Sequence, residues 1–368
     1  MYGGRTRSLV HLVILSLSAQ FSFAVTGTVV ATSGRFHGPL KISDGRISVG
    51  GKKFAWESTM AIATDIERTH IAPNMLRLRS GELWAGTVLG LRNNQIAIRF
   101  ASLGVRRVDV QRVASIEFLA GRTGKGGFKP GRLYREDGSP ISGRLIDISP
   151  QAVRITTSLG VFNLQRGEVW RYVFNSYEHK TATEDELTHV DGSVFRGRIM
   201  STRDGFEFDH PLLGKMRVGL RAVLTVRRRS DKWQWLDPDM FKVTKAEDSL
   251  GPVRAPRAIS RYGPDYRDRP PAWINAIRMD ADTVVDLFPA QGGRFMSVAG
   301  LLYGRSGPNL SVSEGERLLA ERAFDVAGEE VPLSFDVNAG QVVSLSFRAG
   351  ERRSVPCSVV LADPVVVF

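Results

Sequence analysis

The sequence contains a single cysteine, Cys357, among 368 residues. The chain therefore has no internal disulfide, and because Cys357 lies near the C-terminus there is no N-terminal lipid-attachment motif. A protein of this length does not need disulfides, even when exported, since it is long enough to bury apolar cores. Cys357 lies in the apolar run VPCSVVL, a context that favours a buried and unreactive thiol.

Residues typical of active sites are also scarce. Only five histidines follow residue 24, namely His37, His70, His179, His189 and His210. His179 and His189 are ten residues apart and have no clear cysteine or carboxylate partner at the spacing of a metal site, and no GxSxG nucleophile elbow is present. The acidic residues Asp137 and Asp191 precede glycines, so they fit turns better than a glycosidase carboxylate pair. We therefore expect a non-enzymatic protein that needs no metal or cofactor.

A glycine-rich connector, Gly121–Gly131, has some likeness to a phosphate-binding loop. It lacks the GxxxxGK[ST] spacing, and no helix pattern follows it. We therefore expect a flexible link between two repeats rather than a nucleotide site.

Long apolar runs are absent after residue 24, where no segment reaches the about 18 residues that span a membrane as a helix. At the N-terminus, Arg5 and Arg7 precede the short apolar run Leu9–Leu17, and Ser22–Ala24 fits a small-x-small cleavage site. A buried strand or a single membrane anchor is the alternative. The pattern predicts a signal peptide at residues 1–24 and a periplasmic or secreted mature protein without a membrane span.

The formal net charge is +12, and it is unevenly distributed. Residues 1–235 hold 35 Lys and Arg against 20 Asp and Glu, whereas residues 236–368 hold 15 against 18. A basic exported surface attracts acidic glycans, lipid headgroups and other polyanions. General solubility and an arginine-rich composition are the alternative explanation.

A short module recurs in the first two-thirds of the chain. Its clear copies are SGELWAG at Ser80–Gly86, DGSPISG at Asp137–Gly143 and DGSVFRG at Asp191–Gly197, and a weaker first copy runs from Val29 to Asp65. A second glycine turn follows each clear copy about 22 residues later, which gives a period of 54–57 residues. Repeated fold units without repeated catalytic residues favour a binding or scaffolding protein.

Each copy predicts five short strands. In the third copy the Asp137-Gly138 turn closes a hairpin, Val153, Ile155 and Thr157 alternate at the period of a half-buried strand, and Val169–Phe174 ends the unit. The glycine after each turn indicates a bulge or bend, which would let the sheet curl into a closed barrel. This pattern resembles Sm-like and SH3-like small β-barrels over residues 28–229. The resemblance implies the fold only.

Residues 231–272 are rich in proline and predict a linker, and strand patterns resume after Ala272. Three phrases follow in order: TVVDLFPAQGGRF at Thr283–Phe295, GRSGPNLSVSEGER at Gly304–Arg317 and VPLSFDVNAGQVVSLS at Val331–Ser346. This order resembles the novel putative carbohydrate-binding module (NPCBM) family associated with family 98 glycoside hydrolases. The resemblance implies a jelly-roll β-sandwich and places sugar binding in its loops.

One cluster is a candidate ligand site. It joins basic and aromatic residues at the end of the last repeat, namely Arg227, Arg228, Arg229, Lys232, Trp233 and Trp235. Guanidinium and ammonium groups beside aromatic rings suit anionic sugars or single-stranded nucleic acid. The alternative is that the two tryptophans fix the following segment to the last repeat. Trp84 and Trp170 lie at strand positions and are expected in the core or between repeats.

The sequence thus predicts an all-β protein of tandem five-stranded small barrels followed by a β-sandwich. The expected segments are a signal peptide (1–24), four repeats (25–70, 71–121, 128–176 and 184–230), a linker (231–272) and the sandwich (273–368). Its expected role is exported, non-enzymatic binding or scaffolding on cell-envelope or extracellular polysaccharide or another envelope polyanion, with a protein partner there as a further possibility. An accessory or degenerate part of a secreted glycoside hydrolase system and a general polyanion binder are the alternatives.

Overall fold

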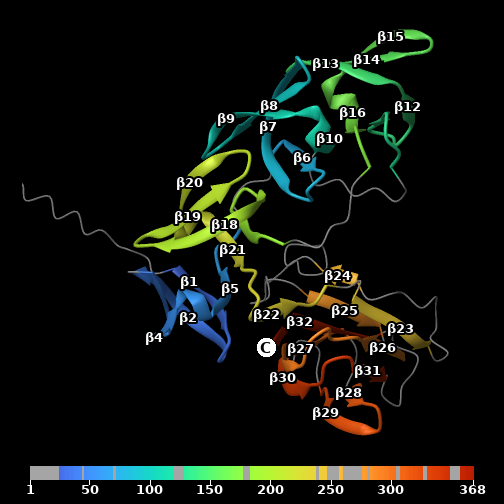
Figure 1. The fold of residues 1–368 in the computed structure, drawn as a ribbon. Helices are drawn as coiled ribbons and strands as arrows, with labels where there is room; N and C mark the ends of the chain where they lie inside the picture. Colours follow the sequence, from blue (N-terminus) through green and yellow to red (C-terminus); the bar gives the residue numbers. More distant parts are fainter. Residues whose placement is uncertain are drawn as a thin grey trace, which may run out of the picture.

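The computed structural model describes residues 25–43, 45–68, 72–119, 128–176, 183–237, 240–246, 257–259, 276–280, 282–303, 307–325, 330–348 and 357–368. Over these residues antiparallel strands dominate, so the predicted all-β class is confirmed (Figure 1). No helix in the described ranges is long and apolar enough to cross a membrane. The predicted signal peptide and most of the glycine-rich connector lie outside the described residues.

Four units of one design follow each other along the chain, each with a single 3₁₀ turn between its fourth and fifth strands. Unit 1 contains β1 (Val25–Ala31), β2 (Gly34–Ser43), β3 (Arg46–Val49), β4 (Lys52–Ala55), η1 (Trp56–Ser58) and β5 (Thr59–Thr64). Unit 2 contains β6 (Asn74–Leu78), β7 (Leu83–Arg92), β8 (Gln95–Phe100), β9 (Gly104–Asp109), η2 (Val110–Arg112) and β10 (Val113–Glu117).

Units 3 and 4 repeat this order. Unit 3 contains β11 (Arg132–Arg135), β12 (Pro140–Ser142), β13 (Arg144–Ile148), β14 (Ala152–Thr157), β15 (Gly160–Gln165), η3 (Arg166–Glu168) and β16 (Val169–Val173). Its β12 and β13 are the two halves of one second strand that is interrupted at Gly143. Unit 4 contains β17 (Asp185–His189), β18 (Val194–Thr202), β19 (Gly205–His210), β20 (Gly214–Gly219), η4 (Leu220–Ala222) and β21 (Val223–Arg227).

The strand order is the same in all four units. The first strand pairs with the second and the fifth, and the second, third and fourth form a meander, so the order is 5-1-2-3-4. The five strands predicted for each repeat are confirmed. The predicted barrel closure is absent, because no described fourth strand pairs with the fifth strand of its unit. The free edge of each fifth strand is used instead to join another unit.

A glycine in the second strand allows the sheet to bend in the three clear repeats, at Gly86, Gly143 and Gly197. A Cβ atom at Gly197 would lie 2.3 Å from the carbonyl oxygen of Asp209 in the third strand. At the other two glycines the corresponding distances are 2.5 Å and 2.4 Å. No side chain fits at these separations, so glycine is required where the two backbones approach most closely.

The hairpin glycines of the repeats have left-handed backbone, with φ of 88° at Gly138 and 90° at Gly192. We expect Gly138→Val to lower the free energy of unfolding by about 1–3 kcal/mol, because a β-branched residue is strained at this φ. A Cβ at Gly138 has no neighbour within 4 Å, so crowding contributes nothing. Gly167 has the same open surroundings without a positive φ, which makes Gly167→Val the control. Equal melting temperatures for the two variants would refute the turn assignment.

The units join through their fifth strands, and not in chain order. β5 of unit 1 pairs with β21 of unit 4, and β10 of unit 2 pairs with β16 of unit 3, both antiparallel. Ile62 faces Val226 at the first junction, and Ile116 faces Tyr172 at the second. These four residues are equivalent in their units, so both junctions have the same two-fold register. Units 4 and 2 meet where β18 approaches β7. The spatial order is therefore 1-4-2-3 (Figure 1).

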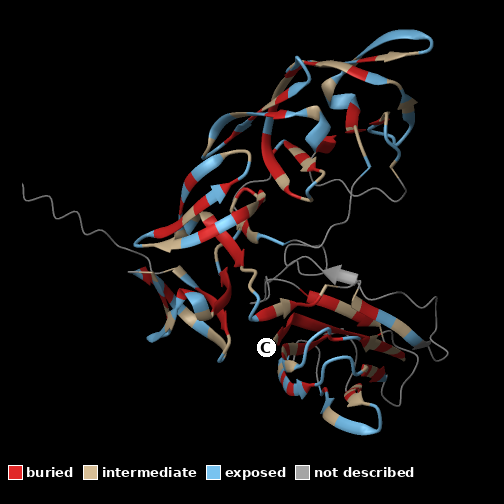
Figure 2. Cartoon of the chain, in the orientation of Figure 1, coloured by how far each residue is buried: buried red, intermediate tan, exposed pale blue. Residues whose placement is uncertain are grey.

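One apolar cluster runs through all four units. Trp84 belongs to it, with a ring centroid 5.6 Å from that of Phe100 and 5.9 Å from that of His210 in unit 4. Trp170 covers the junction of units 2 and 3, where its ring lies 5.2 Å from that of Phe128. Both tryptophans are buried, as predicted for core and inter-unit contacts. Figure 2 shows the buried residues concentrated along the paired strands.

The C-terminal part is the predicted β-sandwich. One sheet has the order β24-β25-β32-β27-β30, with β22 also paired to β32, and the other has the order β23-β26-β31-β28-β29. The strands are β22 (Trp233–Trp235), β23 (Phe241–Ala246), β24 (Arg257–Ile259), β25 (Ala276–Asp280), β26 (Thr283–Leu287), β27 (Gly293–Tyr303), β28 (Asn309–Glu314), β29 (Arg317–Ala323), β30 (Glu330–Val337), β31 (Val343–Arg348) and β32 (Ser358–Val367).

The predicted linker at residues 231–272 is partly wrong. β22, β23 and β24 lie inside it, and each pairs with a strand of the sandwich. Prolines break regular structure locally but leave room for short strands between them. The segments of this region at 247–256 and 260–272 lie outside the described residues.

Candidate functional site

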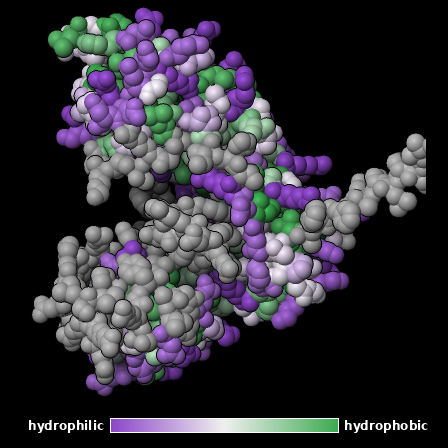
Figure 3. All heavy atoms as spheres, turned by 180° about the vertical axis from the view of Figure 1, so that it is seen from behind, coloured by the Kyte–Doolittle hydropathy of each residue, from purple (hydrophilic) through white to green (hydrophobic). Residues whose placement is uncertain are grey.

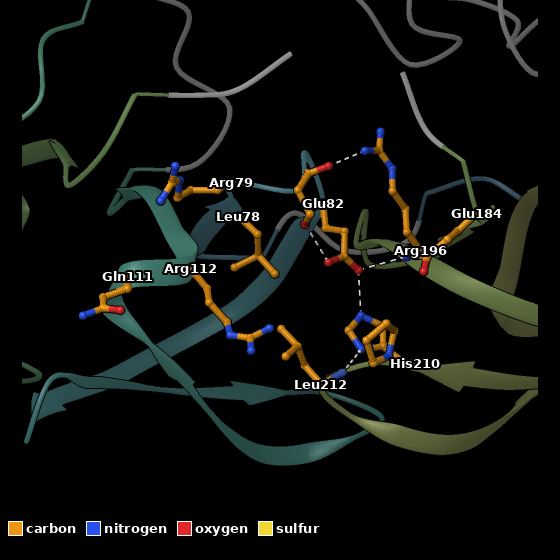
Figure 4. Close-up of a pocket in the computed structure, with 11 residues that line it drawn as sticks. Leu78, Arg79, Glu82, Gln111, Arg112, Glu184, Arg196, His210 and Leu212 are labelled. Carbon is orange, nitrogen blue, oxygen red and sulfur yellow. Dashed lines mark hydrogen bonds and ion pairs between the residues drawn. The ribbon is translucent and has the colours of Figure 1, made fainter. Parts of the chain in front are cut away.

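Two cavities flank unit 2, one toward unit 4 and one toward unit 3. The first has a volume of about 400 Å³ and lies where the β6–β7 turn meets unit 4 (Figure 4). Its lining consists of Leu78, Arg79, Ser80, Glu82, Gln111, Arg112, Glu184, Arg196, His210, Pro211 and Leu212. A volume of this size accommodates a single sugar ring or a small anion.

A buried carboxylate–imidazole pair forms the floor of this cavity. His210 Nε2 lies 2.6 Å from Glu82 Oε1, and both side chains are almost fully buried. The same Glu82 oxygen accepts a hydrogen bond from the backbone N–H of Arg196 at 2.9 Å, and Oε2 accepts one from the Ser80 hydroxyl at 2.9 Å. Glu82 therefore links two elements of unit 4 to its own turn in unit 2.

The hydrogen bonds of His210 fix its tautomer. Its Nδ1 accepts backbone N–H groups from Leu212 at 2.9 Å and Leu213 at 3.1 Å. Nδ1 is thus unprotonated, and the ring proton is on Nε2, where it is donated to Glu82. Both oxygens of Glu82 and both nitrogens of His210 have protein partners, so neither residue has an open position for general acid–base chemistry.

A second histidine–carboxylate pair lies at the same contact between units 2 and 4. His189 Nδ1 is 3.0 Å from Asp191 Oδ1, and its Nε2 is 3.5 Å from the hydroxyl of Ser102 in unit 2. Burial raises the pKa of Asp191, but the His189 ring and the hydrogen bonds from Ser193 outweigh burial and leave this pKa below its usual value. This cluster is closed and serves to hold the two units together.

The second cavity is larger, and most of its polar side chains have no partner within the described residues. It has a volume of about 610 Å³ and lies between the β7–β8 hairpin of unit 2 and the end of β13 in unit 3. Its lining consists of Leu89, Gly90, Arg92, Asn93, Gln95, Ala97, Val105, Arg107, Asp147, Ile148, Ser149 and Pro150. We call this cavity the 2–3 groove.

Five side chains of the 2–3 groove have no hydrogen bond or ion pair within the described part of the chain: Arg92, Asn93, Gln95, Arg107 and Asp147. They are planar amide, guanidinium and carboxylate groups, which match pairs of sugar hydroxyls and ligand carboxylates. The aliphatic lining beside them includes Val105, which is 45% exposed, and the buried Ile148. The groove can bind a polar ligand that has an apolar face.

The geometry of the β7–β8 hairpin places two of the polar side chains of the groove next to each other. The turn between β7 and β8 has Asn93 and Asn94 at φ values of 50° and 58°, the left-handed conformation that a tight hairpin needs and that asparagine tolerates. Arg92 and Gln95 pair directly across the turn. Their side chains therefore emerge together at the mouth of the groove.

The basic–aromatic cluster predicted as a ligand site does not form an exposed surface, and this prediction is wrong for its aromatic residues. Trp233 is 3% exposed and Trp235 is 1% exposed. They pack with Val30, Met60 and Ala61 of unit 1 and with Val365 of the sandwich. Neither ring can stack on a sugar, since both rings are already covered.

The basic residues of that cluster are also engaged. Arg227 pairs with Asp237 at 3.3 Å and lies over the Trp235 ring, and Arg228 donates to the carbonyls of Trp56 and Thr59. Burial lowers the pKa of Arg229 to about 10. Lys232 is the one residue of the cluster that is exposed.

Other residues weighed from the sequence have simple structural roles. Cys357 is buried, and burial raises its pKa to about 11, as expected for an unreactive thiol. No group of three potential metal ligands occurs within the ranges that the structure describes. His70 and His179 lie outside those ranges.

Sequence reasoning did not identify the 2–3 groove. The only local signal was the Asn93-Asn94 turn, where a polar Arg-Asn-Asn-Gln segment joins two apolar strands. Asp147 comes from another unit, and nothing near it in the sequence indicates which hairpin it faces.

Comparison with known proteins gives only remote likenesses. No family model matches the chain, and a search of curated proteins finds no relative. The C-terminal CBM6 of LamC, a marine laminarinase from Zobellia galactanivorans, aligns at 13% identity over 35% of this chain and 99% of that one, with a TM-score of 0.21. The M60 catalytic domain of Clostridium perfringens ZmpB with its two CBM51 domains aligns at 11% identity over 93% and 37%, with a TM-score of 0.27.

An exo-β-1,3-galactanase from Phanerochaete chrysosporium aligns at 12% identity over 94% of this chain and 99% of that one, with a TM-score of 0.21. Scores of this size do not establish a common fold. The resemblances to NPCBM modules and to Sm-like barrels therefore stay predictions.

Proposed function

We propose that this protein is an exported, non-enzymatic scaffold that binds acidic polysaccharide of the cell envelope or extracellular matrix. The observation that carries the proposal is the 2–3 groove, in which five planar polar side chains converge without protein partners. Protein sites for sugars combine such groups with apolar surface, because the sugar ring has hydroxyls at its edge and C–H groups on its face.

The charge of the groove favours an acidic ligand. The described lining of the groove includes two arginines, Arg92 and Arg107, and one carboxylate, Asp147, so its net charge favours a ligand carboxylate such as that of a uronate. The surrounding repeat region is itself basic, which increases the encounter rate with a polyanion.

Three features support binding without catalysis. The best buried candidate for acid–base chemistry, Glu82, has both oxygens occupied by protein donors. Among the described residues that line the 2–3 groove, Asp147 is the single acidic one, whereas glycosidases use two. The units are also joined by strand pairing and shared apolar core, which suits a rigid support.

Export and the assignment of the sandwich are further parts of this proposal. Export rests on the charged, apolar and small-residue pattern of residues 1–24. Membership of the sandwich in the NPCBM family is supported by its six-stranded and five-stranded antiparallel sheets. A second sugar site in that domain would appear as binding that survives changes in the 2–3 groove.

We expect the purified chain to bind polygalacturonate more tightly than dextran in calorimetry, and to lose affinity as salt rises from about 0.05 M to about 0.15 M. Arg92→Ala combined with Arg107→Ala should weaken polygalacturonate binding about tenfold, because each partly exposed charge contributes up to about 1 kcal/mol. Lys41→Ala with Arg46→Ala, on exposed positions of unit 1, removes the same charge elsewhere and is the control.

The outcomes separate the alternatives. Equal losses in both double variants would indicate a general polyanion binder without a defined site. Equal binding of the two polymers, or no effect of the groove variant, would overturn the proposed function. Release of reducing ends from polygalacturonate during the experiment would favour a hydrolase instead.

A further inference from the structure

The fourth strand is an edge in every unit. Among the strands that the structure describes, β4, β9, β15 and β20 each pair only with the third strand of their own unit. An edge strand presents unpaired N–H and C=O groups, and proteins commonly place lysine or arginine there to prevent pairing with another chain. The four repeats therefore provide an internal comparison of how the same edge is protected.

Three of the four edges carry this protection. β4 contains Lys52 and Lys53, β9 contains Arg106 and Arg107, and β20 contains Lys215 and Arg217, whereas β15 (GVFNLQ) contains no charged residue. The pairing registers show which position matters. Four residues are equivalent because each pairs with the third residue of the third strand of its unit: Lys53, Arg107, Asn163 and Arg217. All four are exposed, and only unit 3 has a neutral residue there.

The same edge is apolar. Leu159 is 87% exposed, Val161 is 56% exposed and Phe162 is 40% exposed, and they are consecutive members of the β14–β15 hairpin apart from Gly160. Five other large hydrophobic residues are exposed in the described chain, and they are scattered. The hairpin lies at the far end of unit 3 and is mostly pale blue, for exposed, in Figure 2. In Figure 3, which shows the molecule from behind, this end lies at the upper left and carries a group of green, hydrophobic spheres. Isolated exposed apolar residues are normal, but a group on a bare edge marks an interaction surface.

We propose that β15 pairs with β15 of a second copy of this chain, antiparallel about a two-fold axis. The three-stranded sheet β13-β14-β15 would then continue into its copy. The chain already joins its own units in this way, because both internal junctions pair equivalent strands antiparallel and in equivalent register. Unit 3 ends the spatial order 1-4-2-3, so its fourth strand is the place where the same kind of joint can add a second molecule.

A second copy fits this edge better than a charged partner. β15 has no charge to attract an acidic or basic strand, and self-pairing brings Val161 and Phe162 against their equivalents without like-charge repulsion. A strand of six residues buries less than the about 800 Å² per partner of a standard stable complex. The dimer is accordingly weak in free solution, and it gains strength when several copies are held on one polymer.

Sedimentation equilibrium of the full chain over a concentration series up to about 0.5 mM tests the proposal, with wild type expected to reach twice the chain mass. Asn163→Arg installs the cation that the other three units have at this position, and should weaken dimerisation about tenfold or more. Gln151→Arg is the control, since Gln151 is exposed in the turn at the opposite end of the β14 strand. Hydrogen exchange at the β15 amides should slow with concentration in wild type and in the control.

A monomer at every concentration would overturn the proposal, as would a dimer that Asn163→Arg leaves intact. If Gln151→Arg also abolished the dimer, the loss would come from added charge in general, and the proposed pairing through β15 would be refuted. Asn163 is exposed but faces Arg154 of β14, so Asn163→Arg should lower the stability only by the few tenths of a kcal/mol typical of an exposed like-charge pair. A retained cooperative melting transition then separates lost pairing from lost folding. Polygalacturonate binding by the monomeric variant should persist, so this test fails or succeeds independently of the proposed function.

Discussion

Replacing Glu82 by alanine is expected to lower the free energy of unfolding by about 2–5 kcal/mol, because buried donors lose their acceptor at a cost of about 1–3 kcal/mol each. The carboxylate is buried, and it accepts from His210 Nε2, the Arg196 backbone N–H and the Ser80 hydroxyl. Alanine would leave the buried His210 Nε2–H and the Arg196 backbone N–H without their protein acceptor, whereas the exposed Ser80 hydroxyl can turn to water.

The effect should be concentrated at the contact of units 2 and 4. Only one residue pair, Val194 with Leu83, joins β18 to β7, and Ser193 adds hydrogen bonds to the backbone of Ala85. Thermal denaturation measures the total loss, and hydrogen exchange should show faster exchange at Leu83 and Val194 than at the fifth-strand junctions.

Glu184→Ala is the matched control, because Glu184 lines the same cavity but is exposed. We expect its effect to stay within about 0.5 kcal/mol, as for ordinary surface substitutions. A double-mutant cycle with His210→Ala should show strong coupling to Glu82. Independent effects of Glu82 and His210, or similar losses in both glutamate variants, would contradict the role assigned to the pair.

The repeated unit could be predicted from sequence because its signals are local. The Asp137-Gly138 and Asp191-Gly192 turns require a positive φ, and Gly138 and Gly192 have it. The bend glycine six residues after each turn's first residue lies where two backbones nearly touch, as at Gly197. Such constraints act between residues close in the chain, so they leave a readable pattern at a fixed period.

The assembly of the units could not be predicted in the same way. Ile62 of unit 1 faces Val226 of unit 4 across more than a hundred residues, and an apolar β-branched residue is equally suited to the unit's own core. The barrel prediction failed for this reason, since the repeat pattern cannot show that the free edge of a fifth strand is taken by another unit. The Glu82–His210 pair is hidden likewise, because its members come from different copies.

The basic–aromatic cluster shows how a local pattern can mislead. Arginines beside tryptophans suit both a polysaccharide surface and a packed junction, because a guanidinium stacks on an indole in either setting. Burial decides between them, and burial depends on Met60 and Val365, which lie on each side of the cluster in the fold and far from it in the sequence. The structure favours the junction.

Trp235→Ala is accordingly expected to cost about 3–5 kcal/mol of stability, as for other fully buried tryptophans. The ring is 1% exposed, donates from Nε1 to the Arg228 carbonyl at 2.7 Å, and has the Arg227 guanidinium 4.9 Å from its centroid. Because β22 is also paired with β32 of the sandwich, losing this ring should loosen the sandwich from units 1 and 4.

Calorimetric unfolding should then change from one transition to two, with the new early transition absent from Gln234→Ala. Gln234 lies between the two tryptophans on the same strand and is only half-buried, so it controls for the strand itself. Polygalacturonate binding below the early transition should equal that of wild type, because the ring does not face solvent. If Trp235→Ala instead kept full stability and abolished binding, the tryptophan would be a ligand contact, and the buried junction described for it would be incorrect.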